Sequence, residues 1–157
     1  MVHLLIGIPG SGKTTYSKIL QEELHCDVIS SDKVRDNHPE MTEDKIWPEI
    51  YRLVSVDLKN NRDVIFDATN ITPKVRRRFK DNVEALGVEV KWGAYYIMAD
   101  EQECIERVKI RNTKEGERFL PIEVISSYFK SIIPPTMDEG FEFIKYIKDG
   151  IIQQIIK

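Results

Sequence analysis

The feature that most constrains this chain is a glycine-rich segment that follows a short apolar run and precedes an amphipathic stretch. The run His3–Ile8 predicts a buried strand, because continuous apolar runs are typical of strands covered on both faces. The stretch from about Lys13 to Leu24 predicts a helix with one apolar face. A strand, a glycine-rich turn and a helix in this order predict the first unit of an α/β fold.

Further strands and helices alternate along the rest of the chain. We expect strands at 26–30, 63–67, 89–98 and 141–147, and helices at 44–60, from Thr72 to Gly87, from Asp100 onward and at 121–133. Strands that alternate with helices predict a doubly wound, parallel, five-stranded sheet within one domain, residues 1–157. Asp149-Gly150 predicts a turn, so the tail 151–157 is either irregular or a returning edge strand.

Composition excludes several classes of function. The net charge is −3, which argues against a strongly basic nucleic-acid binder but leaves a local basic patch open. The two cysteines, Cys26 and Cys104, form no CxxC or Cys/His cluster, so no zinc site is expected. The N-terminal apolar run is too short to span a membrane and lacks a charged start, so we expect a cytoplasmic protein.

The segment Gly7-Ile-Pro-Gly-Ser-Gly-Lys13-Thr14 matches the phosphate-binding pattern G-x-x-x-x-G-K-[ST] in full. Glycines let the backbone N–H groups converge on an anion, and the following helix adds its positive end. In this pattern Lys13 reaches the β- and γ-phosphates of ATP, and the Thr14 hydroxyl binds Mg²⁺. The predicted ATP-binding residues here are Gly7, Pro9, Gly10, Ser11, Gly12, Lys13, Thr14 and Thr15.

Asp32 and Arg35 follow the second predicted strand, at the edge of the sheet where ligands bind. A carboxylate there can orient an acceptor hydroxyl and accept its proton, and Arg35 can hold a phosphate through its bidentate fork. The alternative is that Asp32 only caps the N-terminus of a helix. Beside a complete phosphate-binding loop, we favour the catalytic interpretation.

Asp67 ends the third predicted strand, Asp63–Asp67, and Asn70 follows it. An acid in this position can orient a Mg²⁺-bound water or help to hold the acceptor. The alternative is a carboxylate that accepts hydrogen bonds from backbone N–H groups only. Asp67 and Asn70 are therefore predicted acceptor-binding residues, and Asp67 is a candidate metal residue through water.

Two basic segments follow. Lys74–Arg78 either meets a nucleic-acid backbone or forms a solvated helix face. The segment Arg107–Arg118 is denser, and its part from about 111 to 120 predicts a small lid that closes over the phosphates. A lid arginine would reach the transferring phosphoryl group.

With these residues in place, the chain resembles the polynucleotide kinase family of P-loop kinases over nearly its whole length. The matching stretches are Gly7–Thr14, Ser31–Arg35, Phe66–Asn70 with Thr72-Pro73 and Arg76-Arg77, Arg111-Asn112 leading to Leu120-Pro121, and the ending Phe129 to Phe141. The resemblance implies that Asp32 is the general base and that Arg35 binds the acceptor phosphate. Lys13 and a lid arginine would stabilise the transferring phosphoryl group.

The lid departs from the family pattern at one position. The pattern often has an arginine four residues after Arg111, where this chain has Glu115. Arg118 or Arg111 would then supply the catalytic arginine, and Arg111 could instead stack on adenine. The resemblance implies ATP and Mg²⁺ as cofactors and the 5′ end of a nucleic acid as acceptor, with no membrane partner. The sequence leaves an oligomer open.

The sequence thus leaves three hypotheses. The first is an ATP-dependent kinase for the 5′-hydroxyl of DNA or RNA. The second is a kinase for a nucleoside, nucleotide or sugar, which would use the same loop and the same Asp32–Arg35 pair. The third is a regulatory protein that binds ATP without transferring phosphate.

Overall fold

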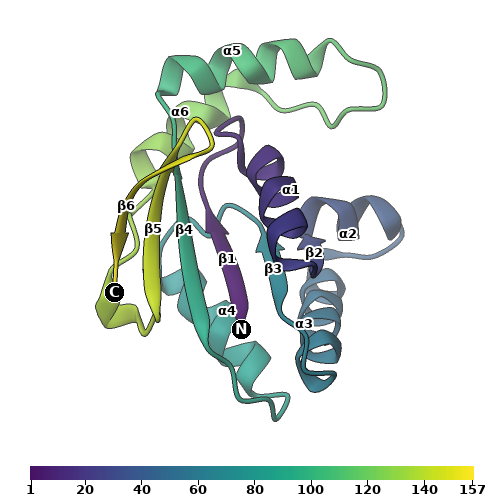
Figure 1. Ribbon diagram of the computed structural model, residues 1–157. Helices are drawn as coiled ribbons and strands as arrows, with labels where there is room; N and C mark the ends of the chain where they lie inside the picture. Colours follow the sequence, from purple (N-terminus) through teal and green to yellow (C-terminus); the bar gives the residue numbers. More distant parts are fainter.

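Six strands form one sheet in the order β2-β3-β1-β4-β5-β6 in the computed structural model, which describes residues 1–157 (Figure 1). The strands are β1 Val2–Ile6, β2 Asp27–Ser30, β3 Val64–Asp67, β4 Trp92–Met98, β5 Phe143–Lys148 and β6 Ile151–Ile156. The helices are α1 Lys13–Leu24, α2 Ser31–Asn37, α3 Glu43–Lys59, α4 Pro73–Glu84, α5 Glu101–Asn112, α6 Ile122–Ser131 and the short 3-10 helix η1 Met137–Glu139. The predicted α/β class with parallel strands is confirmed.

The sheet differs from the prediction by one strand. The first five strands are parallel as expected, but β6 adds a sixth that runs antiparallel to β5. The turn that makes this return is Asp149-Gly150, where both residues have positive φ angles of 52° and 75°. The tail is therefore an edge strand, which was one of the two readings that the sequence left open.

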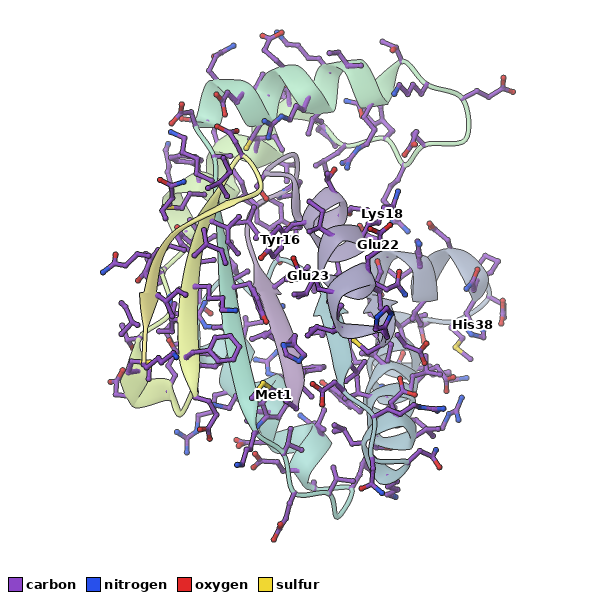
Figure 2. The ribbon with its side chains drawn as sticks, in the orientation of Figure 1. Met1, Tyr16, Lys18, Glu22, Glu23 and His38 are labelled. Atoms are coloured by element: carbon purple, nitrogen blue, oxygen red, sulfur yellow. The ribbon has the colours of Figure 1, made fainter.

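Helices cover both faces of the sheet. The larger core lies under α3 and α4, where Ile50 and Phe79 pack against Leu4 and Phe66 of the strands. On the other face, Tyr16 of α1 packs against Leu5 in a second core. Figure 2 shows Lys18 and Glu22 on the outer side of α1, and both are exposed.

The carboxyl ends of the three strands that precede the predicted site residues lie in register. Leu5 of β1 and Ser30 of β2 both lie opposite Asp67 of β3. The loop after β1, the start of α2 and Asp67 therefore meet at one edge, as parallel strands require. α5 lies across this edge, and Met1 lies at the opposite end of β1 (Figures 1 and 2).

No helix combines the length and the apolar character that a membrane span requires.

Candidate active site

A cleft of about 770 Å³ opens at the carboxyl ends of β1, β2 and β3. Most of its lining residues come from four segments that lie far apart in the sequence, and single residues of α3, α4 and α6 complete it. The four segments are the glycine-rich loop with α1, the start of α2, the segment after β3, and α5 with the loop that follows it. Every predicted site residue lines this cleft except Gly7 and Ser11, which are buried behind it.

The glycine-rich loop presents unused backbone donors. The N–H groups of Gly10 and of Gly12–Thr15 donate no hydrogen bond within the protein. Gly10 and Gly12 adopt left-handed conformations with φ angles of 81° and 99°, which glycine reaches at no steric cost. Such a row of free N–H groups at a helix N-terminus favours an anion, and the phosphates of ATP have the right chemistry.

α5 supports this loop from above. The Arg107 Nη1 donates a hydrogen bond of 3.0 Å to the Gly10 carbonyl oxygen, and Arg107 also lines the cleft. The sequence identified Arg107 only as part of a basic segment. Its spacing of four residues from Arg111 on a predicted helix is the signal that would have placed both side chains on one face.

Lys13 lies at the start of α1 and enters the cleft. Its Nζ donates a hydrogen bond of 3.3 Å to the Ile8 carbonyl oxygen, so the side chain curls back over the loop. Burial is the largest influence on the Lys13 ammonium and lowers its pKa below the ordinary value. The nearby carboxylates of Asp67 and Asp32 oppose this shift. A triphosphate entering the cleft would bring further negative charge to this ammonium group.

Thr14 and Asp67, the two residues predicted to hold Mg²⁺, contact each other. The Thr14 Oγ1 donates a hydrogen bond of 3.2 Å to the Asp67 Oδ2. Burial is the largest influence on the Asp67 carboxyl and raises its pKa above the ordinary value. The charge of Lys13 and the hydrogen bond from Thr14 oppose this shift. A hydroxyl and a carboxylate suit Mg²⁺, which takes oxygen ligands and usually completes its shell with water and phosphates.

Asp32 lies within α2 and does not cap that helix. The N-cap is Ser30, whose hydroxyl accepts a hydrogen bond from the Lys33 N–H at 3.4 Å. The capping interpretation of Asp32 is therefore wrong. Its side chain is exposed to the cleft and accepts a hydrogen bond of 2.9 Å from the Arg35 Nη1.

Arg35 is held by Glu43, a residue that no sequence motif indicates. The Glu43 carboxylate, at the first turn of α3, accepts hydrogen bonds from the Arg35 Nε and Nη2. The guanidinium also lies 5.8 Å from the centre of the Trp47 ring, which lines the cleft. No local motif reveals this pair, because eight residues and the α2–α3 turn separate the two side chains.

The lid arginines are placed differently. The Arg118 Nη2 donates a hydrogen bond of 2.6 Å to Asp36 of α2, and its Nε lies 4.0 Å from Asp32. The Arg111 Nε is buried without a hydrogen-bond partner. The Asn112 side chain closes the base of the loop by bonding the backbone N–H and carbonyl of Leu120. α5 extends to Asn112, so the loop itself begins later than the predicted lid.

The segment after β3 is largely structural. The Asn70 Nδ2 donates hydrogen bonds to the backbone carbonyls of Leu5 (2.7 Å) and Ala68 (3.4 Å), so this amide ties β3 to β1. Arg76 is buried, and its guanidinium binds the Glu139 carboxylate and the Asn70 carbonyl. Arg76 is thus unable to meet a nucleic-acid backbone, whereas Lys74, Arg77 and Arg78 remain on the exposed face of α4.

Comparison with known proteins identifies the family. A family model described as "AAA domain" matches residues 2–135. A search of curated proteins found no match.

Solved structures share the fold at low sequence identity. Kti12 from Chaetomium thermophilum, in complex with ADP-AlF3, is 16% identical with a TM-score of 0.72, covering 95% of this chain and 89% of that one. A gluconokinase from Sinorhizobium meliloti 1021 is 16% identical with a TM-score of 0.61, covering 94% and 81%. A fungal RNA kinase is 17% identical with a TM-score of 0.64, covering 94% and 74%.

These neighbours establish the fold and leave the acceptor open. The family match covers most of the chain, and the phosphate-binding loop lies inside it. The chain therefore belongs to the AAA domain family and is a P-loop kinase-like ATP-binding domain.

Proposed function

We propose that the protein transfers the γ-phosphate of ATP to a hydroxyl group, most specifically the 5′-hydroxyl of a DNA or RNA strand. One observation carries this proposal: the Asp32 carboxylate lines the same cleft as Lys13 and the free N–H groups of the glycine-rich loop. A base and a phosphate cradle that share one cleft suit phosphoryl transfer. The resemblance to polynucleotide kinases and the fold shared with an RNA kinase favour a strand as acceptor.

In the proposed reaction, Asp32 accepts the proton of the acceptor hydroxyl. The hydroxyl oxygen forms a bond to the γ-phosphorus, and the bond from that phosphorus to the β–γ bridging oxygen breaks. ADP leaves with the electron pair. Lys13 and a lid arginine, Arg118 or Arg111, neutralise charge on the transferring group.

The remaining residues bind and orient. Thr14 and Asp67 would hold Mg²⁺, which when bound neutralises charge on the β- and γ-phosphates. Arg35 would hold a phosphate of the acceptor next to the reacting hydroxyl. Arg111 is also the candidate for stacking on adenine, because it lines the cleft from α5.

A kinase for a small molecule is the second candidate, and the acceptor side of the cleft supports it. The carboxylates of Glu43 and Asp36 pair with Arg35 and Arg118, so the two arginines at the acceptor side are already neutralised and attract a polyanion less strongly. The net charge of −3 also disfavours a long polyanion. The gluconokinase with the same fold is consistent with a sugar acceptor.

Label transfer from γ-labelled ATP tests the proposal. We would supply 5′-hydroxyl DNA and RNA oligonucleotides in parallel with nucleosides, nucleotides and sugars. Transfer to the oligonucleotides supports the first candidate, and transfer to a small acceptor alone supports the second. No transfer to any acceptor, by protein shown to bind ATP, would refute both.

Two variants separate chemistry from ATP binding. Asp32→Asn keeps the size of the side chain but removes the base, so transfer should fall by about 10²–10⁴-fold while ATP binding persists. Lys13→Ala should weaken both. Equal transfer by wild-type protein and Asp32→Asn would contradict the assigned role of Asp32.

A further inference from the structure

The guanidinium of Arg35 is occupied by carboxylates on two edges. Its Nε lies 3.1 and 3.0 Å from the Oε1 and Oε2 of Glu43, and its Nη2 lies 2.9 Å from Oε1. The Nη1 donates to Asp32 at 2.9 Å. Hydrogen bonds from Arg35 are the main reason that the pKa of the Glu43 carboxyl is lowered. Glu43 is therefore a charged partner, not a neutral neighbour.

The Nε–Nη2 edge is one of the two edges through which an arginine binds an oxyanion with two hydrogen bonds, and the Nη1 on the other edge already binds Asp32. A carboxylate and a phosphate match the Nε–Nη2 edge with the same pair of parallel N–H···O bonds. Glu43 and an acceptor phosphate therefore compete for one place on Arg35. The Nη1 contact with Asp32 lies on the other side of the guanidinium, so it can persist when Glu43 leaves.

The contact with Glu43 is placed to open. Its side chain is 62% exposed, whereas that of Arg35 is 26% exposed. Glu43 lies in the first turn of α3, after the turn that follows α2. Exposed ion pairs contribute little free energy, so an incoming phosphate has only a modest interaction to replace. An acceptor without a phosphate has no oxyanion that could replace Glu43 at the Nε–Nη2 edge of Arg35.

We propose that Glu43 is a specificity-determining residue that occupies the acceptor-phosphate position on Arg35 until a phosphate-bearing acceptor displaces it. The inference rests on the proposed function, because it takes Arg35 as the residue that binds the acceptor. It adds that this phosphate must displace Glu43 from Arg35, so Glu43 sets how strongly the protein favours an acceptor with a phosphate on the same sugar over one without it. A nucleoside 3′-phosphate, which has a free 5′-hydroxyl, is the smallest nucleic-acid fragment of this class.

Steady-state kinetics of Glu43→Gln test the exchange. With a nucleoside 3′-phosphate as acceptor, we expect KM to fall about two- to fivefold and kcat to stay unchanged, because only the competitor is weakened. With the unphosphorylated nucleoside, KM should not change. The matched control is Glu40→Gln, which removes an exposed carboxylate that does not contact Arg35. It should behave as the wild type with both acceptors.

Three kinetic results would overturn the inference. The first is an unchanged KM for the phosphorylated acceptor. The second is an equal change for both acceptors. The third is a fall in kcat with both, which would make Glu43 a residue that positions Arg35 and Asp32.

Tryptophan fluorescence provides a readout that needs no turnover. Trp47 lies against the Arg35 guanidinium, so loss of the Glu43 contact should alter its emission. Titration with a nucleoside 3′-phosphate should give tighter binding to Glu43→Gln than to the wild type, and Trp47→Phe should abolish the signal change. Equal affinities, or no binding to either protein, would refute the exchange. Absence of label transfer together with tighter binding would refute only the proposed function.

Discussion

The Thr14 hydroxyl donates a 3.2 Å hydrogen bond to the Asp67 carboxylate and so joins the phosphate-binding loop to the end of β3. A hydroxyl and a carboxylate are the kinds of oxygen group that bind Mg²⁺ directly or through water. Thr14→Ala should reduce the gain in ATP affinity that Mg²⁺ provides by about tenfold. Isothermal titration calorimetry with and without Mg²⁺ measures this gain directly.

Thr14→Ser is the control for the metal, because serine keeps the hydroxyl at the same position. It should retain most of the Mg²⁺-dependent affinity. If the alanine and serine variants lose the same amount, or if the loss is as large without Mg²⁺, the hydroxyl does not act through the metal.

Gly10 is required for two separate reasons that substitution can distinguish. Its φ is +81°, and a Cβ at this position would lie 2.7 Å from the Cys104 backbone oxygen of α5. Gly10→Ala should therefore lose about 1–2 kcal/mol to backbone strain and about 1–3 kcal/mol more to the clash. Urea unfolding measures the stability, and ATP affinity should also fall because the loop must shift.

Gly87→Ala, in the turn that follows α4 and away from the cleft, isolates the backbone contribution. Its φ is +84°, but a Cβ there would have no atom within 4 Å. This variant should show the strain alone and should bind ATP normally. Equal destabilisation of the two variants would mean that α5 yields to the added methyl group without cost.

The features that local physics determines were predicted best. The loop Gly7–Thr14 and helix α1 follow from glycine conformation and apolar periodicity, and α1 has the predicted bounds Lys13–Leu24. β4 was predicted to begin at Glu89 but begins at Trp92, which lies opposite Val2, the first residue of β1. Strand ends depend on the partner strand, and the sequence of one strand does not contain that information.

Pairs of residues that lie far apart in the chain could not be predicted either, because their contacts depend on how distant segments pack. Nothing near Arg76 indicates that it is buried, because its partner Glu139 lies 63 residues away. Arg35 was identified by its spacing from Asp32, yet three of its four side-chain hydrogen bonds are with Glu43. Residue type and spacing indicated which chemistry gathers at the cleft, and the packing of α2 on α3 decided which charges pair.

His3 provides a prediction for the pH dependence of stability. Its Nδ1 and Nε2 lie 2.9 Å from the Tyr95 hydroxyl and from Asp63, respectively. Burial lowers the pKa of His3 below its ordinary value of 6.5, although Asp63 opposes this shift. The unfolded chain therefore binds a proton before the folded chain does, so the free energy of unfolding should decrease as the pH falls below 6.5.

Urea unfolding between about pH 7.5 and about pH 5 measures this dependence. Burial raises the pKa of the Asp63 carboxyl, but hydrogen bonds from His3 and the N-terminus help to bring it below the ordinary value. Asp63 therefore loses its contribution to the free energy of unfolding only at more acidic pH. His3→Gln should flatten the slope in the upper range, and His25→Gln, which changes an exposed histidine, should leave it unchanged. An unchanged slope in His3→Gln would assign the dependence to another group.

Arg76 and Glu139 should contribute more to stability than any exposed pair on α4. The Arg76 side chain is fully buried, with its Nε 2.8 Å from the Glu139 Oε1 and its Nη1 2.7 Å from the Asn70 carbonyl oxygen. Arg76→Met should therefore cost about 3–5 kcal/mol, because the Glu139 carboxylate and the carbonyl lose their partner. Arg77→Met is the matched control, since Arg77 is 83% exposed, and it should change stability by less than about 0.5 kcal/mol. Adding Glu139→Leu to Arg76→Met removes the unpaired carboxylate and should recover part of the lost stability. Denaturant unfolding of the three variants measures their free energies of unfolding. If the double variant recovers nothing, the contacts of Arg76 with backbone carbonyls account for most of its effect.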